Sequence, residues 1–334
     1  MSSRIVIWRD VLTIVGDYQF TGAGLGTSEM ILSSYLYLLH VPYLYHVHNL
    51  FIQIALEQGI IGVVGFGCIV LAAGTAGILT TMTSSRYRTV AAASMTSLVA
   101  LVVYGLFDSD LYVGWQVIFI FVPVGFNWVL ADQRIQPIHR ERERPGRVRP
   151  GDVLMGVAPL LLILGMWLRP ETEAALYANL GAVAQAKAEL SVYKWERWLI
   201  QDRVRRNHIK DLAPAIAYYR MALAEDPLNS TVHRRLGQIY LSLGDYSAAL
   251  GNLEAARALA PEQRTIRQLL GEVYAVLGDS VKAAQLWQSV NDDQYQLEAR
   301  LWWYRSLGAA EEARRVEQVL QQIRDDPEPI YTGN

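Results

Sequence analysis

Long apolar runs separated by short polar turns dominate the first half of the chain. Four runs approach the roughly 20 apolar residues that a membrane-spanning helix needs, namely residues 59–81, 89–107, 115–131 and 153–168. The fourth run is short, but Trp167 and Arg169 flank it as interfacial anchors. Pro123 and Pro159 lie inside two of the runs, where lipid-embedded helices tolerate proline. The pattern predicts about four spanning helices.

The polarity of the chain changes after Leu168. Ten Lys/Arg and ten Asp/Glu precede Leu168, whereas twenty and twenty-two follow it. Over all 334 residues, 52% are hydrophobic and 19% are charged, which is too apolar for an ordinary soluble chain. The sequence therefore predicts a membrane half joined to a soluble half. The net charge of −2 indicates no class of partner, because each half is close to neutral.

The arginines predict the orientation of the spans. Arg86 and Arg88 lie between the first two runs, and six arginines lie between residues 134 and 149. Positively charged loops stay in the cytoplasm, so His48, the 107–110 turn and everything after Leu168 are expected outside. The alternative interpretation of the arginine cluster is a nucleic-acid or lipid-headgroup patch, but topology already explains it, and no nucleic-acid partner is predicted.

A repeat of 34 residues occupies the soluble half. Leu236, Gly237, Tyr240, Gly244, Asp245 and Ala249 recur as Leu270, Gly271, Tyr274, Gly278, Asp279 and Ala283. This period is typical of tetratricopeptide repeats, which are helix-turn-helix units. Gly is expected to end the first helix in a left-handed conformation, Asp to cap the second, and Ala to let the helices approach. Residues 215–227 fit the second helix of an earlier repeat, whose first helix is expected within residues 176–207, and residues 302–313 resemble a closing repeat.

The predicted fold is therefore all-α, with membrane helices followed by a soluble helical solenoid of three to four repeats. We expect residues 1–48 to form an exported loop with amphipathic helices, 49–168 the membrane region, and 169–334 the exported repeat domain. Such repeats mostly bind segments of other proteins in a concave groove, although a rigid spacer remains an open alternative.

The most informative motif is His48-Asn49 followed after nine residues by Gly59-Ile60-Ile61-Gly62. It lies where a polar segment meets the first apolar run. Glu57 lies nine residues after His48, so a carboxylate at this depth is expected to face protein or water and to have a partner. Gly59, Gly62 and Gly65 predict a ridge for a close helix contact. The glycines at 22–26 predict a tight turn and not a phosphate cradle.

Residues 4–62 resemble the C-terminal signature of the O-antigen ligase and O-antigen polymerase family. Four segments carry the resemblance: RIVIWR at 4–9, GAGLG at 22–26, HVHNLF at 46–51 and EQGIIG at 57–62. The resemblance implies an integral membrane glycosyltransferase of the cytoplasmic (inner) membrane. It would move a glycan from an undecaprenyl diphosphate carrier to an acceptor hydroxyl on the outer face, without a metal or other cofactor. The family has more membrane helices upstream, so this chain alone is expected to be inactive unless a second polypeptide supplies the missing helices.

The residues of the motif suit that chemistry. Histidine titrates near neutral pH and is a suitable general base for a hydroxyl, so His48 is predicted to be catalytic. A diphosphate leaving group needs cationic donors; Arg4 matches the family's arginine and is predicted to be catalytic, while Arg9 and Asn49 are predicted to bind substrate. Arg4 and Trp8 are expected on one helix face.

Two interpretations compete with this one. Asp108 and Asp110 lie on the same predicted side as His48, and carboxylate pairs serve glycosidases, but solvated turn residues are the favoured interpretation. The chain as a whole has a non-catalytic alternative: a membrane-anchored interaction protein whose spans only tether the repeats.

Overall fold

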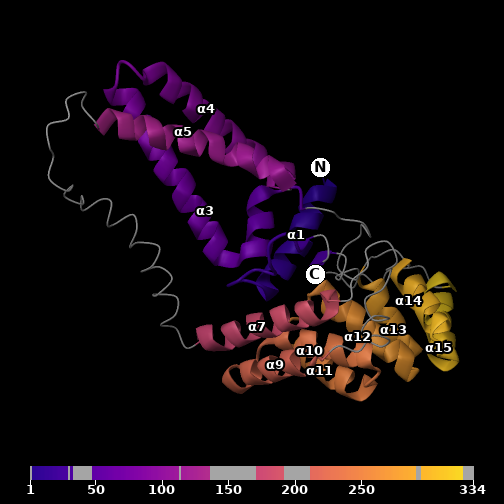
Figure 1. The fold of residues 1–334 in the computed structure, drawn as a ribbon. Coiled ribbons are helices and arrows are strands. Elements are labelled where there is room, and N and C mark those ends of the chain that lie inside the picture. The colour runs from indigo at the N-terminus through magenta and orange to yellow at the C-terminus, as the bar shows by residue number, and fades with distance from the viewer. Residues whose placement is uncertain are drawn as a thin grey trace. The chain divides into compact units, whose positions relative to one another are not determined.

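The computed structural model describes residues 2–28, 31–32, 47–112, 114–135, 171–191, 211–290 and 295–325. All regular elements in these ranges are helical, as the sequence predicts (Figure 1). The chain divides into two compact units. The first contains the described residues up to Ile135 except Ile31 and Leu32, and the second contains the described residues from Glu171 onwards.

Three long apolar segments define the first unit. They are α3 (Leu50–Thr83), α4 (Arg88–Gly105) and the segment Trp115–Asp132, most of which is α5 (Ile118–Ile135). Each is long and apolar enough to cross a membrane. The first three predicted spans are thus confirmed by length and composition, although α3 begins nine residues before the predicted start. The fourth predicted span, 153–168, lies outside the described residues.

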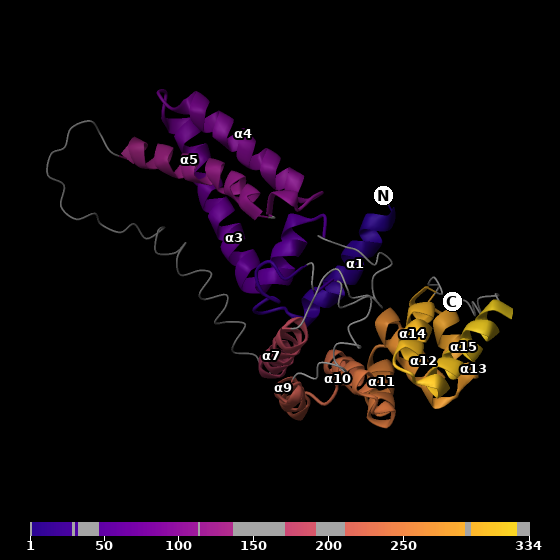
Figure 2. The ribbon, with the colours of Figure 1, turned by 45° about the vertical axis from the view of Figure 1, so that its right-hand side comes forward.

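The three long helices pack against one another, and α4 and α5 lie side by side in both views (Figures 1 and 2). Between these three helices, the tightest contact at a glycine is at Gly77 of α3. A Cβ atom there would collide with Met95 of α4 and touch Asn127 of α5. Large apolar side chains such as Leu71 remain exposed on the outside of the bundle, as expected of lipid-facing helices.

Helix α1 (Ser2–Asp17) precedes this bundle and packs against α3. Its face toward the core carries Val11 and Ile14, both fully buried, and Tyr18 follows immediately after the helix with 1% of its surface exposed. Two short 3-10 turns, η1 (Asp110–Tyr112) and η2 (Gly114–Val117), connect α4 to α5. Leu111, Tyr112 and Val117 of these turns pack against the start of α3.

The second unit is a series of helices. They are α7 (Glu171–Leu190), α9 (Ala213–Glu225), α10 (Ser230–Leu243), α11 (Tyr246–Leu259), α12 (Arg264–Leu277), α13 (Ser280–Gln288), α14 (Tyr295–Ser306) and α15 (Ala310–Asp325). Successive helices among the described residues pair as hairpins: α7 with α9, α10 with α11, α12 with α13, and α14 with α15.

The turns of two hairpins follow the predicted chemistry. Gly244 and Gly278 end α10 and α12 with φ angles of 82° and 92°, in the left-handed region that glycine enters without a steric cost. The next residues, Asp245 and Asp279, cap α11 and α13 by accepting hydrogen bonds from the third backbone N–H after them, at 3.0 and 3.1 Å. The predicted roles of these glycines and aspartates are confirmed.

In each of these two hairpins, a glycine of the first helix packs against a large side chain of the second helix. That side chain lies sixteen residues further along the sequence. A Cβ atom would collide with Leu253 at Gly237 and with Trp287 at Gly271. Gly181 of α7 makes the same kind of contact with Tyr219 of α9, although 38 residues separate them. Helix α7 is therefore the first helix of the earlier hairpin, and it begins at Glu171, ahead of the predicted window.

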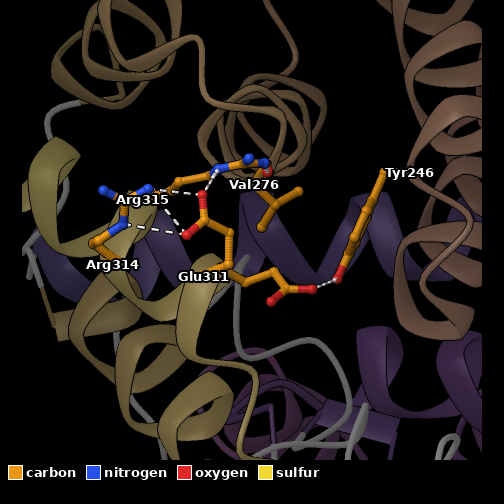
Figure 3. A network of polar contacts seen from close by, with 6 residues as sticks. Tyr246, Val276, Glu311, Arg314 and Arg315 are labelled. Atoms are coloured by element: carbon orange, nitrogen blue, oxygen red, sulfur yellow. Dashed lines mark hydrogen bonds and ion pairs between the residues drawn. The ribbon is translucent and has the colours of Figure 1, made fainter.

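Helix α15 closes this unit by packing against both α12 and α13. Its residues Val316, Val319 and Leu320 are buried in the same apolar core as Trp303. The Arg300 guanidinium of α14 forms a buried ion pair with Glu272 of α12, at 2.9 Å. Near the end of α12, Arg315 of α15 donates a hydrogen bond to the Val276 carbonyl, and Tyr246 donates one to Glu312 (Figure 3). The Arg315 and Glu312 contacts join α15 to earlier hairpins, and the Arg300 ion pair joins α14 to α12.

Replacing Arg315 with methionine is expected to loosen the end of α12 by about 1 kcal/mol, because a guanidinium bound to a C-terminal helix carbonyl also interacts favourably with the helix dipole. We expect hydrogen exchange of the amides at 275–277 to accelerate about fivefold, measured by mass spectrometry. Arg314 is the matched control, since it pairs with Glu311 on the same helix. Equal acceleration in Arg314→Met would contradict the role given to the Val276 contact.

Candidate active site

His48 lies two residues before the start of α3, where the end of α4 meets the start of α3. Asn49 forms this junction. Its side-chain oxygen accepts hydrogen bonds from the backbone N–H groups of Phe51 and Ile52, at 3.0 and 3.1 Å, which caps α3. Its amide donates to the Leu106 carbonyl after α4, at 3.0 Å. The Asn49 side chain therefore ties the two helices together, with 7% of the residue exposed.

The backbone of His48 is held in an uncommon conformation. Its φ angle is 54°, and among the described residues it alone combines a positive φ with a side chain. The left-handed region costs such a residue about 1–2 kcal/mol. The surrounding contacts must offset this cost. One of them is the hydrogen bond from the Trp8 indole N–H of α1 to the Val47 carbonyl, at 3.1 Å.

The imidazole of His48 faces the carboxylate of Asp108. The distance from Nδ1 to Oδ1 is 3.7 Å, and 30% and 23% of the two side chains are exposed. The same carboxylate oxygen accepts hydrogen bonds from the backbone N–H groups of Ser109 and Asp110, at 2.7 and 3.3 Å, which fixes its position in the turn. A carboxylate in this place orients an imidazole and stabilises the imidazolium that forms when it takes a proton.

Sequence reasoning did not find the partnership of His48 with Asp108, since it favoured a solvated turn for this carboxylate. Sixty residues separate the two side chains. The available signal was the alternation of spans, which put the 107–110 turn and His48 on the same side of the membrane.

Arg4 reaches the same turn. Its Nη1 donates a hydrogen bond to the Phe107 carbonyl at 3.0 Å, and the residue is exposed. Arg4 and Trp8 thus lie on one face of α1, as predicted, and both contact the His48 junction. Arg9 is exposed five positions after Arg4, which places it about 140° further round the helix. Of the two predicted arginines, the structure brings Arg4 to the turn beside His48.

Tyr112 is another titratable group in the connection between α4 and α5. Its hydroxyl accepts a hydrogen bond from the Gln58 amide of α3. Burial raises the pKa of Tyr112 above the usual value near 10, more than the Gln58 bond lowers it, and the Glu57 carboxylate raises it further. Tyr112 therefore keeps its proton at neutral pH.

The glycine loop at 22–26 packs on a kink in α3. Ala23 and Gly24 donate hydrogen bonds to the carbonyls of Leu56 and Glu57, at 2.8 and 3.0 Å. At the kink, Gly59 has φ 63° and ψ −162°, and a Cβ atom there would collide with the Phe20 carbonyl. The predicted tight turn at 22–26 agrees with this arrangement.

The prediction that Gly59, Gly62 and Gly65 form a ridge for a close helix contact is wrong. A Cβ atom at Gly65 would meet nothing within 4 Å, and one at Gly62 would meet Gln58 of its own helix. Gly59 lies against the glycine loop and not against a neighbouring long helix. The spacing of three resembled a packing motif, but the first glycine is required by the backbone of the kink.

Residues 1–67 match the family model described as O-antigen ligase. The matched segment contains Arg4, His48, Asn49 and the glycines from 22 to 65, whereas Asp108 and the second unit lie outside it. No curated protein and no solved structure matches the chain. Within the described residues, no three His, Cys, Asp or Glu side chains are grouped to hold a metal. The N-terminal part of the chain is therefore similar to O-antigen ligases, which are integral membrane proteins.

Proposed function

We propose that this protein is a membrane glycosyltransferase of O-antigen ligase or polymerase type, which moves a glycan from undecaprenyl diphosphate to an acceptor hydroxyl. The observation that supports it is the His48 imidazole held beside the Asp108 carboxylate, in a junction that Arg4 also contacts and that begins within the matched segment.

The chemistry assigns one step to each group. Because Nδ1 of His48 faces Asp108, Nε2 accepts the proton of the acceptor hydroxyl, and Asp108 stabilises the imidazolium. The hydroxyl oxygen then forms a bond to the anomeric carbon while the bond from that carbon to the diphosphate breaks. The diphosphate leaves as an anion, and the Arg4 guanidinium, with donors beyond the one bound to Phe107, stabilises its charge.

Asn49 acts in this proposal by orienting His48. Both ends of its side chain are engaged, by the start of α3 and by Leu106, so it contributes by holding the junction. Direct donation to a sugar oxygen is the alternative, through the second N–H of the Asn49 amide beside the one bound to Leu106. Arg9 is proposed to bind substrate from a second face of α1.

The second unit is proposed to be a tetratricopeptide array on the extracytoplasmic side of the inner membrane that binds a protein segment. Its support is the 34-residue period together with the glycine ends and aspartate caps of α10 to α13.

The product common to every acceptor is free undecaprenyl diphosphate, so its release tests the function without knowledge of the acceptor. The full chain is reconstituted in proteoliposomes with lipid-linked glycan and envelope lipids from its own cells. We expect release above that of empty liposomes, or release that requires co-reconstitution with a membrane protein supplying further helices. No release in either arrangement would favour the non-catalytic membrane anchor.

The orientation is tested by thiol labelling. The Glu262 side chain is 90% exposed, and Cys68 is a free cysteine. In a Cys68→Ser background, Glu262→Cys is expected to react with an impermeant maleimide in intact spheroplasts. Arg86→Cys, in the turn between α3 and α4, is the control and should react only after lysis. The reverse pattern would contradict the proposed orientation.

A further inference from the structure

We infer that Gln53 and Glu57 of α3 form a hydrogen-bond relay that positions His48 for proton transfer. The inference rests on the proposed function, since it assigns the relay to the same site. Neither residue touches the reacting atoms, so both are positioning residues. They lie one turn apart on α3, and 1% and 3% of their surfaces are exposed.

Gln53 contacts the residue before His48. Its Oε1 accepts a hydrogen bond from the Val47 N–H at 3.3 Å, while its Nε2 donates to Ser28 Oγ at 2.6 Å and to Glu57 Oε1 at 3.1 Å. The Val47 carbonyl accepts from Trp8. Val47 is therefore held at both its N–H and its carbonyl, and the carbonyl belongs to the peptide plane directly before the Cα atom of His48.

Glu57 anchors the other end of the relay. Its Oε2 accepts a hydrogen bond from the Gly26 N–H at 2.9 Å, and its Oε1 accepts from the Ser28 N–H at 3.3 Å. With the Gln53 amide, three N–H donors converge on one buried carboxylate. The glycine loop at 22–26 is thereby connected through Gln53 to the backbone beside His48.

The charge of Glu57 determines which way the Gln53 amide faces. A carboxylate only accepts hydrogen bonds, so the NH₂ of Gln53 must face Glu57, and its oxygen must face Val47. Without that preference the amide can flip and present its NH₂ to the Val47 N–H, two donors facing each other. The left-handed backbone of His48 then loses one of the contacts that offset its cost, and the imidazole moves away from Asp108.

The relay is tested by exchanging its two side chains in the full-length protein. Glu57→Gln removes the orienting charge, and Gln53→Glu places two carboxylates together. The exchange Gln53→Glu/Glu57→Gln restores an acceptor for Val47 and a donor between the two positions. Asn127→Leu is the control, because Asn127 is a fully buried amide of α5 that packs on Gly77 and Met95.

Two measurements are made on each variant. The first is kcat and KM for release of undecaprenyl diphosphate in proteoliposomes. The second needs no activity: crosslinking of His48→Cys to Asp108→Cys, in a Cys68→Ser background, by a short bis-methanethiosulfonate reagent. Its rate reports how closely the two positions are held. If the parent protein itself releases no undecaprenyl diphosphate, the proposed function fails, while the crosslinking still tests the positioning.

Each single change is expected to lower kcat about 100-fold with KM little changed, as for a misplaced catalytic group, and to slow the crosslinking. The exchange variant recovers most of both, Glu57→Asp recovers part, and Asn127→Leu resembles the parent. The inference is overturned if Glu57→Gln keeps the parent kcat and crosslinking rate. It is also overturned if the folded exchange variant is no better than the single changes, or if KM alone rises.

Discussion

Replacing His48 with alanine is expected to reduce the release of undecaprenyl diphosphate by about 10³-fold, the contribution typical of a positioned general base. KM for the lipid-linked glycan should change little, because the imidazole acts on the acceptor hydroxyl and not on the carrier. Asp108→Asn keeps the size of the turn side chain but removes its negative charge, so it should lower kcat by a smaller factor, about 10²-fold. Initial rates in proteoliposomes check both values.

Asp110→Asn is the matched control for Asp108→Asn. It removes the same charge two residues away, from a side chain that is exposed in η1. If Asp108→Asn and Asp110→Asn lower kcat equally, the loss comes from the local negative charge. The partnership of Asp108 with His48 is then refuted. If His48→Ala leaves release unchanged, His48 is not the base.

Replacing Gly59 with alanine is expected to destabilise the first unit by about 3 kcal/mol, because φ 63° with ψ −162° is a region that only glycine enters readily. The added methyl group would also meet the backbone of Phe20 and of Gly22, where the glycine loop begins. The loop would separate from α3, which also removes the donors of Gly26 and Ser28 from Glu57. Loss of helicity in titrations with sodium dodecyl sulfate measures the change.

Gly65 provides the comparison for Gly59. It lies six residues later in the same helix, with nothing within 4 Å of an added Cβ atom. Alanine favours a helix over glycine by about 0.5–1 kcal/mol, so Gly65→Ala should be neutral or stabilising in the same titration. Similar destabilisation in both variants would show that Gly59 is not a special position of the backbone.

Local features of the fold were predictable from the sequence because they depend on neighbouring residues. The apolar runs give α3, α4 and α5, and the Gly-Asp pairs at 244–245 and 278–279 give the hairpin turns. The start of α3 was misplaced because Gln53, Glu57 and Gln58 interrupt its first nine residues, and hydropathy alone does not count such a stretch as part of a span.

Features that join distant segments were not predictable. Asp108 meets His48 only because α4 returns beside α3, and no local pattern distinguishes Asp108 from Asp110. The hairpin of α7 and α9 was obscured because 38 residues, and not sixteen, separate Gly181 from Tyr219, which breaks the 34-residue period. Gly59 illustrates the limit of spacing arguments, since its role depends on the loop packed against it.

The hydrogen bonds of Arg4, Trp8 and the Asn49 amide all end on main-chain carbonyls, those of Phe107, Val47 and Leu106. Every residue type has a main-chain carbonyl, so these three acceptors survive any substitution at their own positions. Evolution is therefore free to vary the exposed side chains at 106 and 107, whereas Val47 is constrained by its burial and the donors Arg4, Trp8 and Asn49 have no such latitude. We therefore expect related sequences to vary more at 106 and 107 than at Arg4, Trp8 and Asn49.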